Sequence, residues 1–142
     1  MIAKTEVKVR YAETDQMGIV HHSNYPIWYE VGRTEFIKEF GITYSQFEKE
    51  GLILPLLSLD SNFILPAFYE DELSIHTCVL SANYVKLEFY YEIYRKSDGK
   101  LINTGHTTHG IVEKNMRPCN IKKKYPNIYQ LLLKMVHIPK AT

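Results

Sequence analysis

Carboxylates and histidines are concentrated between Glu13 and His22, directly before a segment with the pattern of a helix. Asp15 follows in this acidic stretch, Gly18 lets the chain bend, and His21 and His22 come just before the predicted helix. A carboxylate can act as a base or a nucleophile, and the unpaired N–H groups of a helix N-terminus can stabilise an oxyanion. These residue types at this spacing therefore indicate acyl transfer.

A strand and a helix are expected to position these groups. Apolar and charged residues alternate before Ala12, which predicts a strand at Glu6–Tyr11. The helix is predicted to begin near Ser23 or Asn24, both good N-cap residues, and to continue to about Phe40. It is apolar over much of its circumference, as expected for a helix that a curved sheet buries on several sides.

The remainder of the chain reads mostly as strands, with a short helix predicted at Asn127–Met135. The predicted strands are Ile53–Leu59, Asn62–Leu65, Leu73–Val79, Leu87–Tyr94 and Leu101–Glu113. An Asp-Gly turn joins the last two. One long helix beside a four- to six-strand antiparallel sheet is an α+β architecture, and 142 residues suit a single domain, 1–142.

Composition excludes several classes of protein. A formal net charge of +1 gives no support to nucleic-acid binding, and the basic run Lys122–Lys124 is predicted to be a solvated surface turn. No apolar run is long enough to span a bilayer, and no secretory signal is visible at the N-terminus, so we expect a cytoplasmic protein. Cys78 and Cys119 form no C-x-x-C pair, which indicates free thiols.

Other catalytic sites are not supported by the spacing. His106 and His109 would lie on opposite faces of a strand, so we expect no metal site, and no cofactor is indicated. No G-x-S-x-G elbow or Gly-rich phosphate loop is present. The adjacent His21 and His22 are predicted to point in different directions, with His21 a packing or surface residue.

Residues 9–25 read VRYAETDQMGIVHHSNY, and residues 33–36 read RTEF. This pattern resembles the hotdog-fold thioesterases of the 4-hydroxybenzoyl-CoA thioesterase type, and among them the YbgC-like acyl-CoA thioesterases. The resemblance covers roughly residues 5–135. It implies a hotdog fold, in which an antiparallel β-sheet wraps around a long central helix. It also implies a homodimer or homotetramer with active sites at the subunit interface.

Carried over by position, the resemblance implies that Asp15 is the catalytic carboxylate. His22 would lie at the start of the helix, where its backbone N–H polarises the thioester carbonyl and its imidazole contributes. Substrate contacts are implied for Tyr11, Gly18, Asn24 and Tyr25. Two positions depart from the family: Glu13 stands where many relatives have Asp, and His21 stands where an aromatic residue is usual.

The activity implied is hydrolysis of an acyl-CoA, or of an acyl carrier protein thioester, to a carboxylic acid and a thiol. Asp15 would attack the thioester or activate a water, and both routes stay open. The alternatives are a non-catalytic acyl-CoA-binding sensor and a hotdog dehydratase or hydratase; the lack of Asn-Pro between Asp15 and His21 counts against the latter. Arg95, Lys96 and the lysines at 122–124 either contact coenzyme A phosphates or form a solvated face.

Overall fold

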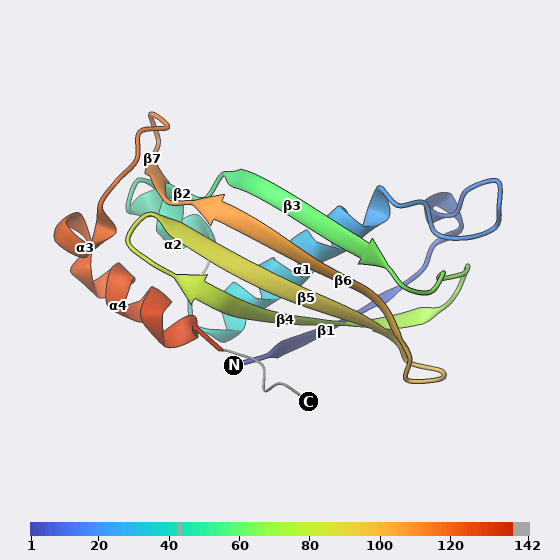
Figure 1. The fold of residues 1–142 in the computed structure, drawn as a ribbon. Coiled ribbons are helices and arrows are strands. Elements are labelled where there is room, and N and C mark those ends of the chain that lie inside the picture. The colour runs from blue at the N-terminus through green and yellow to red at the C-terminus, as the bar shows by residue number, and fades with distance from the viewer. Residues whose placement is uncertain (43, 138–142) are drawn as a thin grey trace.

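An antiparallel sheet packed on one long helix dominates the computed structural model, which describes residues 1–42 and 44–137 (Figure 1). The five-stranded sheet has the order β1-β4-β5-β6-β3, and a two-stranded sheet pairs β2 with β7. The strands are β1 (Ala3–Lys8), β2 (Leu52–Ile53), β3 (Leu56–Phe63), β4 (Glu72–Ala82), β5 (Lys86–Arg95), β6 (Leu101–Gly110) and β7 (Val112–Glu113). The helices are α1 (Asn24–Glu39), α2 (Tyr44–Lys49), α3 (Ile121–Lys124) and α4 (Pro126–Met135), with a 3₁₀ turn at Tyr11–Glu13. The predicted α+β architecture is confirmed.

The core lies between α1 and the face of the sheet that it covers, and Figure 1 shows α1 running behind the strands. Alternate residues of β4, β5 and β6 are buried; in β4 and β5 they are mostly apolar, whereas in β6 they are Asn103, Gly105, Thr107 and His109. On α1, Trp28, Tyr29 and Phe36 are buried against them. Tyr29 stacks on Tyr91 of β5 with ring centroids 4.4 Å apart, which fixes the helix against the sheet.

Several element boundaries differ from the predictions. The strand expected at Glu6–Tyr11 ends at Lys8, because the Arg10 N–H donates to the Glu13 carboxylate and closes a 3₁₀ turn. The apolar run near Pro55, which has no N–H to donate, divides into β2 and β3. The strand expected at Leu101–Glu113 likewise divides into β6 and β7, and helix α2 was not predicted.

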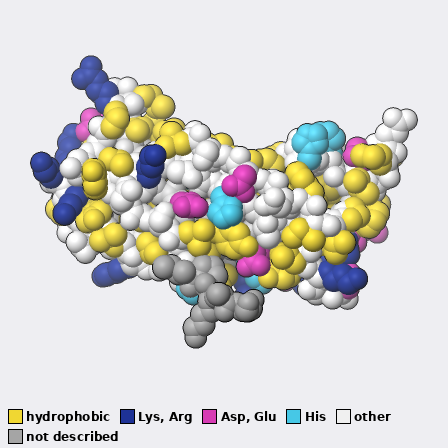
Figure 2. Space-filling view, in the orientation of Figure 1, with side chains coloured by type: hydrophobic (Ala, Val, Ile, Leu, Met, Phe, Trp, Pro, Cys, Tyr) yellow, Lys and Arg dark blue, Asp and Glu magenta, His cyan; other side chains and the backbone are white. Residues whose placement is uncertain are grey.

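The basic run Lys122–Lys124 forms the short helix α3, so the predicted turn is wrong, although the three lysines are exposed as expected. Figure 2 shows basic side chains gathered at this end of the molecule. Lys124 forms an ion pair with Glu113. The two cysteines are free, as predicted, and both are buried.

Within the described residues, no helix is long and apolar enough to cross a membrane.

His109 lies buried on β6 with both ring nitrogens engaged. Its Nδ1 is 3.2 Å from the Leu54 carbonyl oxygen, and its Nε2 is 3.0 Å from Thr107 Oγ1. Because a carbonyl only accepts, Nδ1 carries the proton and donates, and Nε2 accepts from the hydroxyl. Burial and the nearby positive charge of Arg33 lower the pKa of His109 to about 4.

This depressed pKa makes stability depend on pH. In the unfolded chain His109 takes up a proton below about pH 6.5, whereas in the folded protein it does so only near pH 4. The contribution of neutral His109 to the free energy of unfolding is therefore fully present above pH 6.5 and is lost as the pH falls from 6.5 to 4. The loss totals about 3 kcal/mol. We expect the difference in free energy of unfolding between wild type and His109→Gln to shrink by about 2 kcal/mol from pH 7 to pH 5 in urea titrations. Parallel pH curves for the two proteins would contradict this.

Candidate active site

Asp15 begins a tight turn that its own side chain stabilises. Its carboxylate Oδ1 accepts the Met17 N–H at 2.9 Å, and its carbonyl accepts the Gly18 N–H at 2.9 Å. Gly18 has φ +82°, a backbone conformation that glycine adopts without strain. The Asp15 N–H donates to the Ile19 carbonyl at 2.8 Å. The turn therefore fixes the orientation of a half-buried carboxylate.

The start of α1 leaves one backbone donor free. His21 N–H donates to the Glu13 carbonyl, and Ser23 N–H donates to His21 Nδ1 at 3.2 Å. The His22 N–H between them donates no hydrogen bond within the part of the chain that the structure describes. Since the helix places a partial positive charge here, this N–H is available to an oxyanion.

The two adjacent histidines lie side by side. Their ring centroids are 4.1 Å apart at an interplanar angle of 32°. The prediction that they point in different directions is therefore wrong, because the His21 ring turns back to accept the Ser23 N–H. His21 is exposed, as expected, and its ring accepts the N–H of Ser23, the residue before α1.

A second segment, residues 64–68, is held beside the Asp15 turn. Val20 N–H donates to the Ala67 carbonyl at 2.9 Å. Arg95 donates to the Pro66 carbonyl and forms a 3.2 Å ion pair with Asp71. The Val20–Ala67 bond ties the segment after β3 to the loop that carries Asp15, and Arg95 anchors the same segment to β5.

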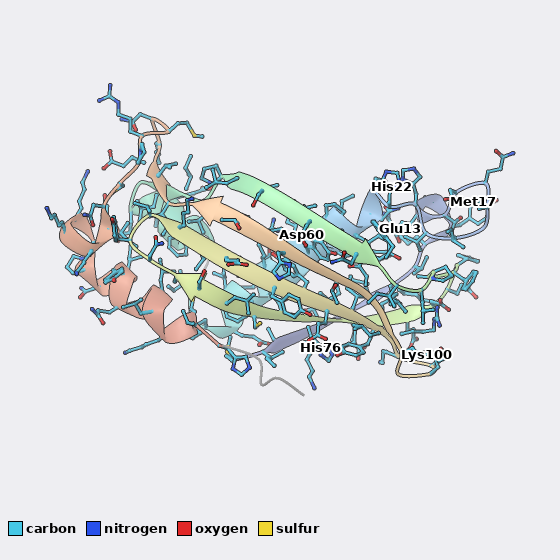
Figure 3. All side chains as sticks on the ribbon, in the orientation of Figure 1. Glu13, Met17, His22, Asp60, His76 and Lys100 are labelled. Carbon is cyan, nitrogen blue, oxygen red and sulfur yellow. The ribbon has the colours of Figure 1, made fainter. Side chains whose placement is uncertain are left out.

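Together these segments enclose a cleft of about 370 Å³ with Asp15 and His22 in its lining. Figure 3 shows His22 and Met17 at the end of the molecule where α1 begins. The rest of the lining is Met17, Ile19, Val20, Tyr25, Phe63, Ile64, Leu65 and Pro66. Burial raises the pKa of Tyr25 to about 12, so its hydroxyl stays protonated. The cleft therefore combines one carboxylate and one histidine with apolar walls.

The predicted site residues are only partly brought together. Asp15, His22 and Tyr25 line the cleft, and Gly18 shapes its turn. Tyr11 is outside the lining; it is 77% exposed and packs edge-on against Tyr69. Asn24 is also outside the lining. Sequence reasoning missed the wall at residues 63–66, for which the only signal was an apolar run ending at Pro66.

Two other predicted features can be placed. Arg95 and Lys96 are both engaged by carboxylates: Arg95 by Asp71 and Asp98, and Lys96 by Glu6 at 2.7 Å. This favours a structural role for both. His106 is half-exposed and His109 is buried, so they lie on opposite faces of β6 as predicted.

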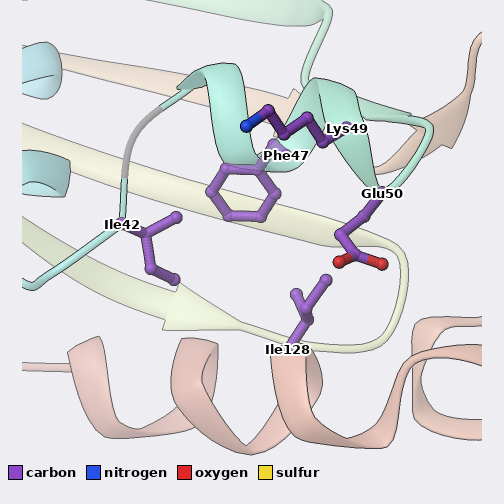
Figure 4. Close-up of a pocket in the computed structure, with 5 residues that line it drawn as sticks. All are labelled: Ile42, Phe47, Lys49, Glu50 and Ile128. Atoms are coloured by element: carbon purple, nitrogen blue, oxygen red, sulfur yellow. The ribbon is translucent and has the colours of Figure 1, made fainter.

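A second cavity of about 370 Å³ lies between α2 and α4 (Figure 4). Its lining is Ile42, Phe47, Lys49, Glu50 and Ile128. Among its described residues this lining has no histidine and no free backbone donor at the start of a long helix. The two cavities have the same volume, so the Asp15 cleft is favoured as the active site by the chemistry of its residues.

Comparison with known proteins shows the family of the chain. The family model of the thioesterase-like superfamily matches residues 9–141, which include the whole acidic loop and helix start. The chain belongs to the thioesterase-like superfamily. A Bacillus subtilis (strain 168) protein provisionally named acyl-CoA thioesterase YneP is 39% identical over 127 residues, covering 89% of this chain and 91% of its own length. The Escherichia coli (O157:H7) acyl-CoA thioester hydrolase YbgC is 28% identical, covering 68% of this chain and 72% of YbgC.

Solved structures in the superfamily share the fold. A DHNA-CoA thioesterase from Staphylococcus aureus superposes with a TM-score of 0.87 at 31% identity, covering 94% of this chain and 89% of that one. The resemblance inferred from residues 9–25 and the predicted hotdog fold are therefore confirmed. These three proteins are named as thioesterases or as a thioester hydrolase, which supports acyl-CoA thioester hydrolysis by this chain.

Proposed function

We propose that this protein hydrolyses acyl-CoA thioesters, with Asp15 as its catalytic carboxylate and His22 as the donor to the oxyanion. The observation that carries the proposal is the cleft in which Asp15 and His22 share one lining at the start of α1. The names of the similar proteins, an acyl-CoA thioesterase and an acyl-CoA thioester hydrolase, support the same reaction.

The reaction adds the oxygen of a water to the acyl carbon and breaks the carbon–sulfur bond, and the thiolate takes up a proton. Asp15 either attacks the carbonyl, with water releasing the acid later, or removes a proton from the water that attacks. In both routes negative charge develops on the carbonyl oxygen. The free His22 N–H at the positive end of α1 stabilises that charge, and its imidazole lines the cleft beside it.

The apolar walls provide the binding site for the acyl group. Tyr25 and Phe63 pack edge to face with ring centroids 5.2 Å apart, and Tyr25 packs likewise on Trp28. An acyl group placed against these rings and against Ile64 and Leu65 would bury apolar surface. Tyr25 would contact the acyl group directly, whereas Gly18 would act on substrate binding only through the turn that shapes the cleft.

The test is release of free thiol, measured with a chromogenic thiol reagent, from a panel of aromatic, short-chain and long-chain acyl-CoAs. We expect turnover with at least one of them. Tight binding without thiol release would instead support an acyl-CoA sensor, and loss of enoyl absorbance with the thioester intact would support a hydratase. Either result would overturn the proposal.

We also propose that the protein works as a homodimer, or a homotetramer built from it, that pairs along β3. This strand is an edge of the sheet, and it exposes Leu57 (55%), Leu59 (39%) and Phe63 (57%). A long apolar edge is a template for pairing with another strand. Because Phe63 also lines the Asp15 cleft, a second copy on β3 would lie beside the active site.

Replacing an exposed leucine on this edge by a charge should break the assembly. We expect wild type to sediment at twice or four times the 16.6 kDa of one chain, and Leu57→Glu to shift it toward 16.6 kDa. Leu133→Glu changes an exposed leucine on α4 (38%) and should leave the mass unchanged. A wild type that sediments as a single chain would exclude the dimer.

A further inference from the structure

We propose that Asn24 is a positioning residue that aims the His22 N–H at the substrate carbonyl; this inference rests on the proposed function. The Asn24 amide Nδ2 donates to two main-chain oxygens, at 2.9 Å to Glu13 and 3.0 Å to His21. Both of its N–H groups are thereby used within the protein. Asn24 is half-buried and does not line the cleft, so these contacts, rather than substrate, explain its place at the helix start.

The bond to His21 acts on the oxyanion donor itself. The His21 carbonyl and the His22 N–H belong to one peptide unit, which is planar and trans. That carbonyl accepts both the side-chain N–H of Asn24 and its backbone N–H, at 3.0 and 3.1 Å. In a trans peptide the C=O and the N–H point in opposite directions. The hydrogen bonds that hold the His21 carbonyl oxygen therefore also fix the direction of the His22 N–H. Hydrogen bonds to the oxygen also polarise the N–H and strengthen it as a donor.

The bond to Glu13 ties the acidic loop to the same peptide. The Glu13 carbonyl accepts from Asn24 and also from the His21 N–H at 2.9 Å. Glu13 is 5% exposed, and its carboxylate accepts the Arg10 N–H, which anchors this part of the loop. Asp15 lies two residues further along. Asn24 therefore holds the carboxylate and the oxyanion donor in one fixed relation.

The sharpest variant is Asn24→Asp, which keeps the shape of the side chain but has no N–H to donate. Its carboxylate would repel the Glu13 and His21 carbonyl oxygens. We expect kcat to fall by about 10- to 100-fold, because a misaligned oxyanion donor forfeits much of its effect. KM, and the Kd of an S-alkyl-CoA thioether, which has no carbonyl, should change by less than about twofold. A negative charge in the first turn of a helix is favourable and offsets part of the loss of the two hydrogen bonds, so we expect a fall in melting temperature but a folded protein.

Two further variants make the test specific. Asn24→Ala removes the same bonds without adding charge and should also lower kcat about 10- to 100-fold. Asn83→Ala is the matched control: Asn83 Oδ1 accepts the Val85 and Lys86 N–H groups at 2.8 Å in the turn between β4 and β5, remote from the cleft. It should lower stability and leave kcat unchanged.

The backbone amide signal of His22 in a ¹⁵N–¹H spectrum gives a readout that does not need activity. It should shift in both Asn24 variants and stay in place in Asn83→Ala. Wild-type kcat in both Asn24 variants, an unmoved His22 signal, or an equal loss of kcat in Asn83→Ala would overturn the inference. A wild type that hydrolyses no thioester would instead refute the proposed function, and the His22 signal would then test Asn24 alone.

Discussion

Asp15→Asn is expected to lower kcat for acyl-CoA hydrolysis by about 10³-fold or more while the protein stays folded. The amide oxygen can still accept the Met17 N–H that the carboxylate accepts at 2.9 Å, so the turn keeps its shape. An amide is neither a nucleophile nor a base at neutral pH, so both routes of attack are lost. Initial rates of thiol release at saturating substrate measure the effect.

Asp60→Asn supplies the control for this result. Asp60 is an exposed aspartate on β3, paired with His106 at 3.0 Å and outside the cleft (Figure 3). Its substitution should change kcat by less than about twofold, as expected for an exposed pair of small energetic weight. If Asp15→Asn kept wild-type turnover, the assignment of Asp15 would fail.

Gly105→Ala is expected to destabilise the fold by about 3 kcal/mol. A Cβ at Gly105 would lie 2.4 Å from the Tyr29 hydroxyl oxygen and 2.5 Å from the adjacent ring carbon. Tyr29 cannot move aside, because it is fully buried, stacks on Tyr91 and is hydrogen-bonded to Ser61 at 2.7 Å. The added methyl group must therefore separate α1 from the sheet. Urea unfolding monitored by circular dichroism measures the loss.

Gly110→Ala, on the same strand, is the matched control. Its Cβ would meet only Leu57 side-chain carbons at 3.6 Å or more, an ordinary contact, so we expect a change within about 1 kcal/mol. In a Tyr29→Leu background, most of the cost of Gly105→Ala should disappear, because the clashing hydroxyl and ring are absent. Equal costs for Gly105→Ala and Gly110→Ala would show that the close approach of Tyr29 is not what requires a glycine.

The parts of the site that are local in sequence could be predicted from it. Asp15, His22 and the start of α1 lie within one continuous motif, so their proximity follows from the turn at Gly18 and from the helix that begins at Asn24. The long helix and the antiparallel strands were also predictable, because apolar residues recur at helical spacing in the former and at every second position in the latter. The motif itself led to the superfamily that the comparisons then showed.

The missed features depend on contacts that no local pattern records. The wall at residues 63–66 is held beside Asp15 by the bond from the Val20 N–H to the Ala67 carbonyl, and Arg95 of β5 holds the Pro66 carbonyl. The rings of His21 and His22 lie together because the His21 ring accepts the Ser23 N–H. The spacing of the residues in the sequence does not predict this contact. Pairing along β3 involves a second chain and is a proposal drawn from its exposed leucines.

The most direct test of thioester hydrolysis at Asp15 is the product balance of one reaction. Wild type and Asp15→Asn would each be incubated with the acyl-CoA that releases thiol fastest, and the products quantified by mass spectrometry. We predict that wild type forms free coenzyme A and carboxylic acid in equal amounts, and that Asp15→Asn forms almost none. Intact substrate with the wild type, or equal product from both proteins, would contradict the account.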